Sequence, residues 1–253
     1  MALLEIRKLN KHFGGLVAIH DVDLDVFDLE ILGLIGPNGA GKTTLFNVIS
    51  GFFPPMSGSV IFNGEDITGL RADQIARKGI GRTFQASTVF MQSTVFDNVY
   101  SAYYMHYKEP AWKAFLHTAS VREEERVIKR KAMEILEFTG LASQKDKIAG
   151  NLSSGYKKVL AISITLATNP KLLLLDEPAT MLSPDKVEMI MELITKVRST
   201  GTTVVIIEHN MKAIMDYCAR IVVLAYGGKI AEGSPQEIRE NKEVIEAYLG
   251  VMD

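Results

Sequence analysis

The sequence predicts an α/β fold in which a mixed β-sheet core is interrupted by a mostly helical insertion. Short apolar runs typical of buried strands alternate with helical patterns at both ends of the chain. One of these runs leads directly into the pattern G-x-x-x-x-G-K-[ST], which binds phosphate between a strand and a helix. Between residues 86 and 168 the strand patterns are replaced by helical ones.

The composition is that of a globular protein, with 253 residues, 47% hydrophobic and 23% charged. The formal net charge of −2 argues against broad nucleic-acid binding, so we expect no nucleic-acid partner. No apolar run approaches the roughly 18 residues of a membrane-spanning helix, so work at a membrane would need a partner protein. The single cysteine, Cys218, excludes an internal disulfide framework, and we interpret it as a half-buried helical residue without a role.

The first 35 residues are predicted to form antiparallel strands joined by turns. Strand-like runs cover 3–9, 17–26 and 30–35. Gly14 and Gly15 separate the first two runs, and Phe27-Asp28 precedes the third. An antiparallel β subdomain is therefore expected ahead of the phosphate-binding pattern.

The phosphate-binding pattern lies within residues 36–44, GPNGAGKTT. Glycines let the backbone wrap closely around an anion, and the following helix adds the positive end of its dipole. Lys42 can reach the β- and γ-phosphates of a nucleotide, and the hydroxyl of Thr43 can ligate Mg²⁺. The predicted phosphate-binding residues are Gly36, Asn38, Gly39, Ala40, Gly41, Lys42, Thr43 and Thr44.

Two acids follow a second apolar run. Residues 172–175 are four leucines, and Asp176 and Glu177 come directly after them. An acid at the carboxyl end of a parallel strand lies at the rim where α/β proteins bind ligands. Asp176 is therefore predicted to belong to the Mg²⁺ shell, and Glu177 to polarise an attacking water molecule.

The other elements follow from periodicity and from turn residues. Residues 120–140 carry charges on one side and apolar residues on the other, which predicts a long amphipathic helix. Residues 104–119 are irregular and are interpreted as an insertion. The remaining predictions are helices at 43–49, 73–78, 156–167, 184–200, 210–217 and 235–249, and strands at 59–64, 171–175, 202–207, 221–224 and 229–232.

The order of these motifs resembles the nucleotide-binding subunit of an ATP-binding cassette (ABC) transporter, over essentially the whole chain. The resemblance implies a P-loop NTPase of the ABC type, with a catalytic core at 1–85 plus 169–253 and an inserted α-helical subdomain at 86–168 that carries the signature motif. It implies ATP and Mg²⁺ as cofactors and ATP hydrolysis to ADP and phosphate, coupled to transmembrane transport. It also implies integral membrane permease partners and a peripheral position on the cytoplasmic face of the cell membrane.

The resemblance also assigns roles to single residues. Phe13 falls where the family has an aromatic ring that stacks on adenine, and Gln85 where a glutamine reaches the metal and the attacking water. His209 matches the switch histidine that contacts the γ-phosphate. The implied catalytic set is Glu177, His209, Gln85 and Lys42, and the implied metal set is Thr43, Gln85 and Asp176.

The signature reads Leu152-Ser153-Ser154-Gly155-Tyr156 instead of LSGGQ. Ser153 and Gly155 are kept, and we predict that these two contact phosphate. In the family the signature of one subunit closes on the ATP of another, so a homodimer or a heterodimer with a second ABC ATPase is expected. Ser154 would be strained if its φ were positive. Ser183, where many relatives have aspartate, puts a further contact across the dimer in doubt.

Several features resemble the ATPase of branched-chain amino-acid importers. They are the segment 82–85, the insertion near 104–122, the segment 207–211 and the tail at 233–250. Lipopolysaccharide-export and urea-import ATPases share much of this pattern and stay open as alternatives, as does a non-transport ABC ATPase. We interpret about half of the large apolar residues between 84 and 103 as core of the helical subdomain. The others are interpreted as a cleft that accepts a short helix of a permease.

Overall fold

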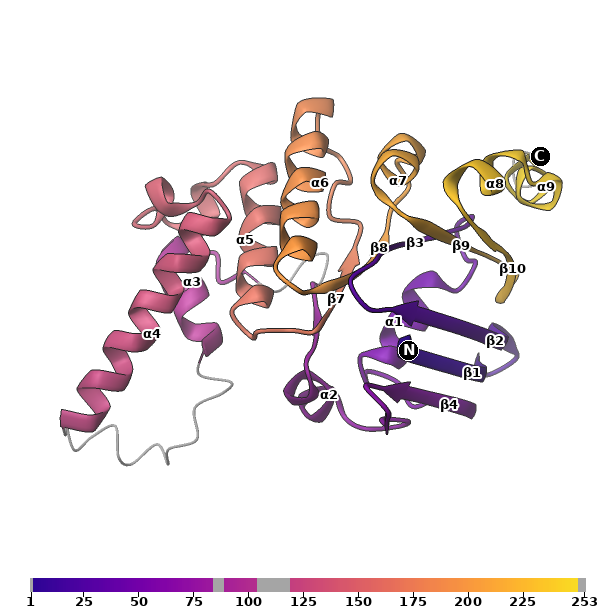
Figure 1. Ribbon diagram of the computed structural model, residues 1–253, viewed down its shortest axis with the longest axis horizontal. Coiled ribbons are helices and arrows are strands. Elements are labelled where there is room, and N and C mark those ends of the chain that lie inside the picture. The colour runs from indigo at the N-terminus through magenta and orange to yellow at the C-terminus, as the bar shows by residue number, and fades with distance from the viewer. Residues whose placement is uncertain (1, 84–88, 104–118, 250–253) are drawn as a thin grey trace. The chain divides into compact units, whose positions relative to one another are not determined.

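The structure, a computed structural model, describes residues 2–83, 89–103 and 119–249 (Figure 1). The chain divides into two compact units, the first formed by residues 1–82 and 171–253 and the second by residues 83–170. The first unit contains two β-sheets, whereas the described part of the second is helical. None of the helices in the described ranges combines the length and apolar character that crossing a bilayer requires.

The first sheet is antiparallel and comes from the N-terminal part of the chain. Its strand order is β2-β1-β4-β5, with β1 at Ala2–Phe13, β2 at Leu16–Phe27, β4 at Ser57–Phe62 and β5 at Glu65–Asp66. Apolar side chains on one face of β1 and β2, among them Leu4, Ile6 and Leu24, are buried. Alternation of buried and more exposed residues is what a sheet with one solvated face requires.

The second sheet is mixed, in the order β10-β9-β3-β8-β7-β6. Five strands run parallel, and β10 pairs antiparallel with β9 at the edge. Their bounds are β3 Ile31–Ile35, β6 Ile80–Arg82, β7 Leu172–Asp176, β8 Thr203–Ile207, β9 Arg220–Ala225 and β10 Gly228–Gly233.

The prediction that residues 30–35 continue the antiparallel strands is wrong. The strand β3 lies in the middle of the second sheet and pairs parallel with both β8 and β9. All five of its residues are buried. A short, uninterrupted apolar run is typical of a strand covered on both faces, and this distinguishes β3 from the alternating β1 and β2.

Six helices complete the described part of the first unit. They are α1 Lys42–Ile49, α2 Ala72–Lys78, α6 Pro184–Ser199, α7 Met211–Tyr217, α8 Pro235–Glu240 and α9 Lys242–Leu249. One hydrophobic cluster includes Leu45 and Phe46 of α1 together with buried residues of both sheets. The helix that follows the phosphate loop is therefore anchored in the common core of this unit.

The C-terminal helix predicted at 235–249 is two helices. Asn241 separates them, with an extended backbone at φ −75° and ψ 118°. Its side-chain Oδ1 accepts a hydrogen bond from the Val244 backbone N–H at 3.1 Å. Asparagine competes with helical hydrogen bonding in this way, which ends α8 and caps α9.

Cys218 is more deeply buried than predicted, at 5% exposure, and it follows α7 in extended backbone instead of lying within the helix. A Cβ placed on Gly33 would be 3.1 Å from its sulfur, so the thiol packs against β3. Burial raises the pKa of the thiol to about 12.

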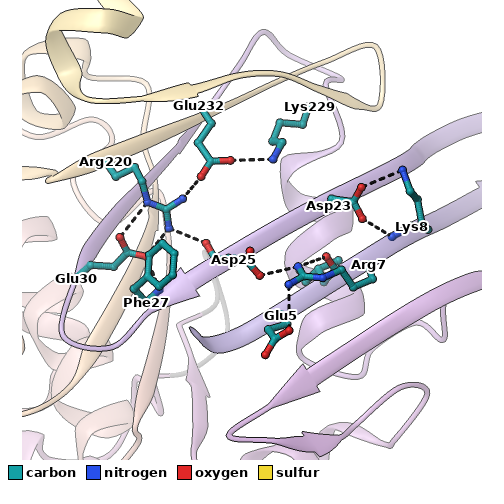
Figure 2. Close-up of polar contacts among 11 residues, drawn as sticks. Glu5, Arg7, Lys8, Asp23, Asp25, Phe27, Glu30, Arg220, Lys229 and Glu232 are labelled. Carbon is teal, nitrogen blue, oxygen red and sulfur yellow. Dashed lines mark hydrogen bonds and ion pairs between the residues drawn. The ribbon is translucent and has the colours of Figure 1, made fainter. Parts of the chain in front are cut away.

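An arginine on β9 connects the two sheets of the first unit (Figure 2). Nη2 of Arg220 donates to Glu30 Oε1 and to the backbone oxygen of Asp25, both at 2.6 Å. Its Nη1 pairs with Glu232 of β10, and its guanidinium lies 4.8 Å from the centre of the Phe27 ring. Asp25 and Phe27 belong to β2, so this one side chain holds the edge of the first sheet to the second.

The second unit is built from three described helices, α3 Val95–Ala102, α4 Ala119–Phe138 and α5 Ser154–Leu166. Buried residues of these helices, such as Val99, Leu136 and Leu160, form its interior. Of the apolar residues between 84 and 103, Val95 and Val99 are core, whereas Phe90 and Met91 are exposed. The predicted insertion at 104–119 lies almost wholly outside the described residues.

Candidate active site

The phosphate loop leaves the carboxyl end of β3 through backbone that only glycine adopts easily. Gly36 has φ 148° and Gly41, which caps α1, has φ 100°. A Cβ on Gly36 would lie 2.0 Å from the backbone oxygen of Leu224, and one on Gly41 would lie 2.4 Å from that of Ala18. Any side chain at these two positions would displace the loop, so the sequence pattern is required by close packing.

Lys42 places its ammonium group inside this loop. Its Nζ donates to the backbone oxygens of Gly36 at 2.7 Å and Pro37 at 2.9 Å. Burial lowers the pKa of Lys42, and the carboxylates of Glu177 and Asp176 act in the opposite direction. The loop thus holds a desolvated positive charge at its centre, which is the electrostatic environment that a phosphate group needs.

A cavity of about 350 Å³ opens above the phosphate loop. It gathers residues from the β1–β2 hairpin, from the loop with the start of α1, and from the ends of β7 and β8. The residues that line it are Phe13, Leu16, Val17, Ala18, Asn38, Gly39, Ala40, Gly41, Lys42, Thr43, Thr44, Glu177 and His209. Gly36 and Asp176 lie outside this lining.

Asp176, the last residue of β7, has one carboxylate oxygen bound and one left over. Oδ2 accepts a hydrogen bond from Nη2 of Arg82 at 3.1 Å. Oδ1 is buried and has no hydrogen-bond partner within the described residues. Burial raises the pKa of Asp176, and the charge of Arg82 opposes this. A buried oxygen without a donor suits a hard cation such as Mg²⁺, so the residues present fit this metal.

Glu177 and His209 form a contact at the wall of the cavity. Glu177 Oε1 lies 3.0 Å from Nε2 of His209. The hydroxyl of Thr180 donates to the other oxygen, Oε2, at 3.3 Å. Glu177 has a left-handed backbone at φ 51°, which turns its side chain away from the line of β7. Such backbone strain is stored where function requires a particular side-chain direction.

Comparison with known proteins agrees with this geometry. The family model described as ABC transporter matches residues 19–180. The chain belongs to the ABC transporter family. A second model, described as branched-chain amino acid ATP-binding cassette transporter, matches residues 229–253 of this cassette. Membership in the family implies ATP binding and ATPase activity, as the sequence predicts.

Relatives extend the similarity over the full chain. The cassette is 40% identical over 249 residues, 98% of each chain, to the high-affinity branched-chain amino acid transport ATP-binding protein BraF of Pseudomonas aeruginosa. It is equally similar, with the same coverage, to the protein LivG of Escherichia coli K12, which carries the same description.

Solved structures confirm the predicted fold class. The ADP conformation of MJ1267, an ATP-binding cassette of an ABC transporter, superposes with a TM-score of 0.87 at 32% identity over 99% of each chain. The dimeric structure of MJ0796, a bacterial ABC transporter cassette, gives 0.77 at 25% identity over 92% of this chain and 98% of that one.

The sequence did not lead us to predict the residues that pack against the Phe13 ring. The ring of Phe53 packs edge-on against it, with centroids 5.3 Å apart at 78°. The ammonium of Lys11 lies 5.3 Å from the Phe13 ring centre and donates to the backbone oxygen of Pro54 at 2.8 Å. The aromatic pair after Gly51 was the available signal, since two phenylalanines in a loop need something to pack against.

Two charged residues of the site were also missed. Arg82 binds Asp176 and donates to Asn47 Oδ1 at 2.7 Å and Ser50 Oγ at 2.9 Å, so it joins β7 to α1 and its C-cap. Glu208 is 2% exposed and accepts hydrogen bonds from the backbone amides of Ala179 and His209. The signal for both was a charge directly at the end of a short strand, which marks a buried polar group that needs partners.

Three further predicted residues are not part of the described first unit. Gln85 lies outside the described residues. Ser153 and Gly155 belong to the second unit, where Ser153 is the N-cap of α5 and Gly155 is buried in its first turn. Ser154 begins α5 and is not among the residues with positive φ, so the strain considered for this position does not arise.

Proposed function

We propose that this cassette is the ATP-hydrolysing subunit of an importer of branched-chain amino acids. The observation that carries the ATPase site is the single cavity that unites Phe13, the phosphate loop, Glu177 and His209. The substrate class rests on the relatives, whose descriptions name branched-chain amino acid transport. Export of lipopolysaccharide and import of urea are the alternatives to be tested against it.

The residues have separate tasks in this proposal. Phe13 stacks on adenine, while the loop amides and Lys42 bind the phosphates. Glu177 polarises the attacking water, and His209, which already contacts Glu177, binds the γ-phosphate. Gln85 is proposed to reach the metal and the water.

Thr43 and Asp176 are the residues of the described site that would hold Mg²⁺, together with Gln85. Oδ1 of Asp176 carries this assignment, because it is buried and no described residue donates a hydrogen bond to it. When bound, the metal supplies positive charge that stabilises the charge developing on the phosphates. Arg82 keeps the other oxygen of Asp176 in place and so fixes the direction of Oδ1.

The assembly follows from the signature residues. Ser153 and Gly155 are proposed to contact the ATP of a second cassette, in a homodimer or with a different ATPase. Residues 1–85 with 169–253 act as the catalytic core and residues 86–168 as the helical subdomain. The cassette is proposed to bind integral membrane permease subunits and to work on the cytoplasmic face of the cell membrane.

The first experiment uses Glu177→Gln, which removes the carboxylate that polarises water and keeps its shape. We expect ATP binding to persist while hydrolysis falls by about 10²- to 10⁴-fold. Light scattering after size exclusion, with and without Mg-ATP, measures assembly of the same variant. An ATP-dependent dimer supports self-pairing through the signature. Hydrolysis at the wild-type rate would show that Glu177 does not polarise the attacking water.

A second experiment tests the transport assignment. The cassette is purified from membranes in detergent, and integral membrane proteins that accompany it are identified. Reconstituted complexes are then assayed for uptake of leucine and urea and for lipopolysaccharide release. Leucine uptake that is lost in Lys42→Ala supports the proposal. Association with soluble partners alone would contradict it, as would urea or lipopolysaccharide transport.

A further inference from the structure

Glu208 is a buried carboxylate that joins two catalytic segments of the first unit. The residue is 2% exposed, directly after the buried strand β8 and directly before His209. Burying a carboxylate is costly unless several donors surround it. We therefore expect this carboxylate to bind specific donors within the fold.

The hydrogen bonds of Glu208 define this task. Oε1 accepts from the backbone N–H of Ala179 at 2.5 Å, and Oε2 from the backbone N–H of His209 at 3.1 Å. Ala179 is itself buried, at 3% exposure, in the turn that follows Glu177. One carboxylate thus holds the turn after Glu177 to the segment that carries His209.

The ladder between β7 and β8 explains why a side chain is needed here. Asp176 is the last residue of β7 and pairs with Ile207, the last residue of β8. One further main-chain hydrogen bond, from Glu177 N–H to the oxygen of Ile207 at 2.9 Å, continues the connection. Glu208 extends it by two more residues, to the amide of Ala179.

The side chains of the residues proposed to react belong to the cavity lining. Glu177 and His209 line the cavity and touch each other at 3.0 Å. Glu208 is 2% exposed and is not among the residues that line the cavity. Its hydrogen bonds to the amides of Ala179 and His209 give it a route to the reacting groups through the backbone.

We propose that Glu208 is a positioning residue that sets the distance between Glu177 and His209 by binding the backbone amides of Ala179 and His209. This inference rests on the proposed ATPase site and deepens it. A misplacement of reacting groups by about 1 Å can cost on the order of 10²-fold in rate. The role is therefore expected to appear in kcat and not in nucleotide binding.

The first test compares Glu208→Gln with Glu30→Gln. Glu208→Gln keeps the size of the side chain, but places an NH₂ group where one backbone N–H needs an acceptor. We expect kcat to fall by about 10- to 100-fold, with KM for ATP and the Kd of a fluorescent ATP analogue changed less than about threefold. Glu30→Gln removes a carboxylate from the Arg220 cluster and is expected to lower the thermal midpoint with kcat unchanged.

A second test does not depend on activity. Amide hydrogen exchange of the nucleotide-free protein is followed by mass spectrometry on peptides that contain Ala179. Exchange at Ala179 should become faster in Glu208→Gln, and faster still in Glu208→Asp, because the shorter side chain cannot span the same distance. Glu30→Gln should leave these peptides unchanged.

A double-mutant cycle then separates positioning from general damage. In the Glu177→Gln background, adding Glu208→Gln should not lower the residual rate further, because the group it positions is already gone. A fully multiplicative effect, wild-type kcat in Glu208→Gln or unchanged exchange at Ala179 would each overturn the inference. A wild-type cassette that binds but does not hydrolyse ATP would refute the proposed function instead, while the exchange result still tests the connection.

Discussion

Arg220 and Arg82 both bind carboxylates within the first unit, and their two clusters differ in what they leave unbound. Arg220 meets Glu30 and Glu232, and Glu30 accepts in addition the backbone N–H of Phe27 at 2.6 Å (Figure 2). Nη2 of Arg82 lies 3.1 Å from Oδ2 of Asp176, and the two side chains are 5% and 4% exposed. There Oδ1 of Asp176 is buried with no hydrogen-bond partner in the described ranges.

The difference separates structure from chemistry. In the Arg220 cluster one guanidinium faces two carboxylates, those of Glu30 and Glu232. Burial lowers the pKa of Arg220, but its hydrogen bond with Glu30 and the nearby carboxylates leave that pKa raised. In the Arg82 cluster burial outweighs the attraction, and the pKa of Arg82 is lowered. The buried Oδ1 of Asp176, which has no hydrogen-bond partner among the described residues, leaves a place for a cation and supports the proposal that the second cluster binds Mg²⁺.

The largest expected effect comes from removing one carboxylate in each cluster. Asp176→Asn removes the carboxylate proposed to hold Mg²⁺, so we expect ATP hydrolysis to fall by about a hundredfold or more. Stability should fall as well, because the buried guanidinium of Arg82 loses its counter-charge. Glu30→Gln should destabilise the fold by about 2 kcal/mol and leave kcat unchanged.

Steady-state hydrolysis and guanidinium unfolding of the same preparations measure both quantities. The comparison fails if the effects are exchanged, with Glu30→Gln losing activity at unchanged stability. It also fails if Asp176→Asn hydrolyses ATP at the wild-type rate.

A smaller effect is expected when each arginine becomes lysine. Lysine keeps the charge but loses the planar fork. In Arg82→Lys one ammonium cannot reach Asn47, Ser50 and Asp176 together, so Asp176 is less firmly placed and kcat should fall by about tenfold. Arg220→Lys should cost about 1 to 2 kcal/mol of stability with kcat unchanged. Equal kcat in the two variants would show that the fork at Arg82 does not position Asp176.

The phosphate-binding end of the site was predictable because its chemistry is local in sequence. The loop amides, Lys42 and Thr43 follow one another, and the acids at 176 and 177 end one strand. Backbone geometry at Gly36 and Gly41 follows from the same short pattern. In the fold, likewise, periodicity located most helices and strands of the first unit.

The supporting residues were not predictable because their partners are far away along the chain. Arg82 meets Asp176 across 94 residues and Glu208 meets Ala179 across 29. A charge at the end of a short strand marks Arg82 and Glu208 as buried polar groups, but it does not identify their partners. The parallel pairing of β3 was missed for the same reason, since its neighbours β8 and β9 lie at the other end of the sequence. Asn241 shows that a single residue can also override a longer pattern, because this asparagine ends α8 within an otherwise helical pattern.

The smallest expected effect concerns Cys218, which lies beside the Arg220 cluster. Burial, and then the charge of Glu30, raises the pKa of this thiol to about 12. An unfolded thiol titrates near 8.5, so above this pH the unfolded chain loses a proton that the folded protein keeps. The stability that depends on the protonated thiol is therefore complete below about pH 8 and is lost progressively as the pH rises toward 12.

At pH 9 this amounts to a loss of less than about 1 kcal/mol. Guanidinium unfolding at pH 7 and pH 9 should show it as an extra destabilisation of the wild type relative to Cys218→Ala. The thiol should also react slowly with a disulfide reagent at pH 8 until the protein is unfolded, because the thiolate is the reactive form. Rapid labelling of the native protein would mean that the segment between α7 and β9 opens locally. The Arg220 cluster, with Arg220 at the start of β9, would then hold the two sheets together less firmly than its contacts indicate.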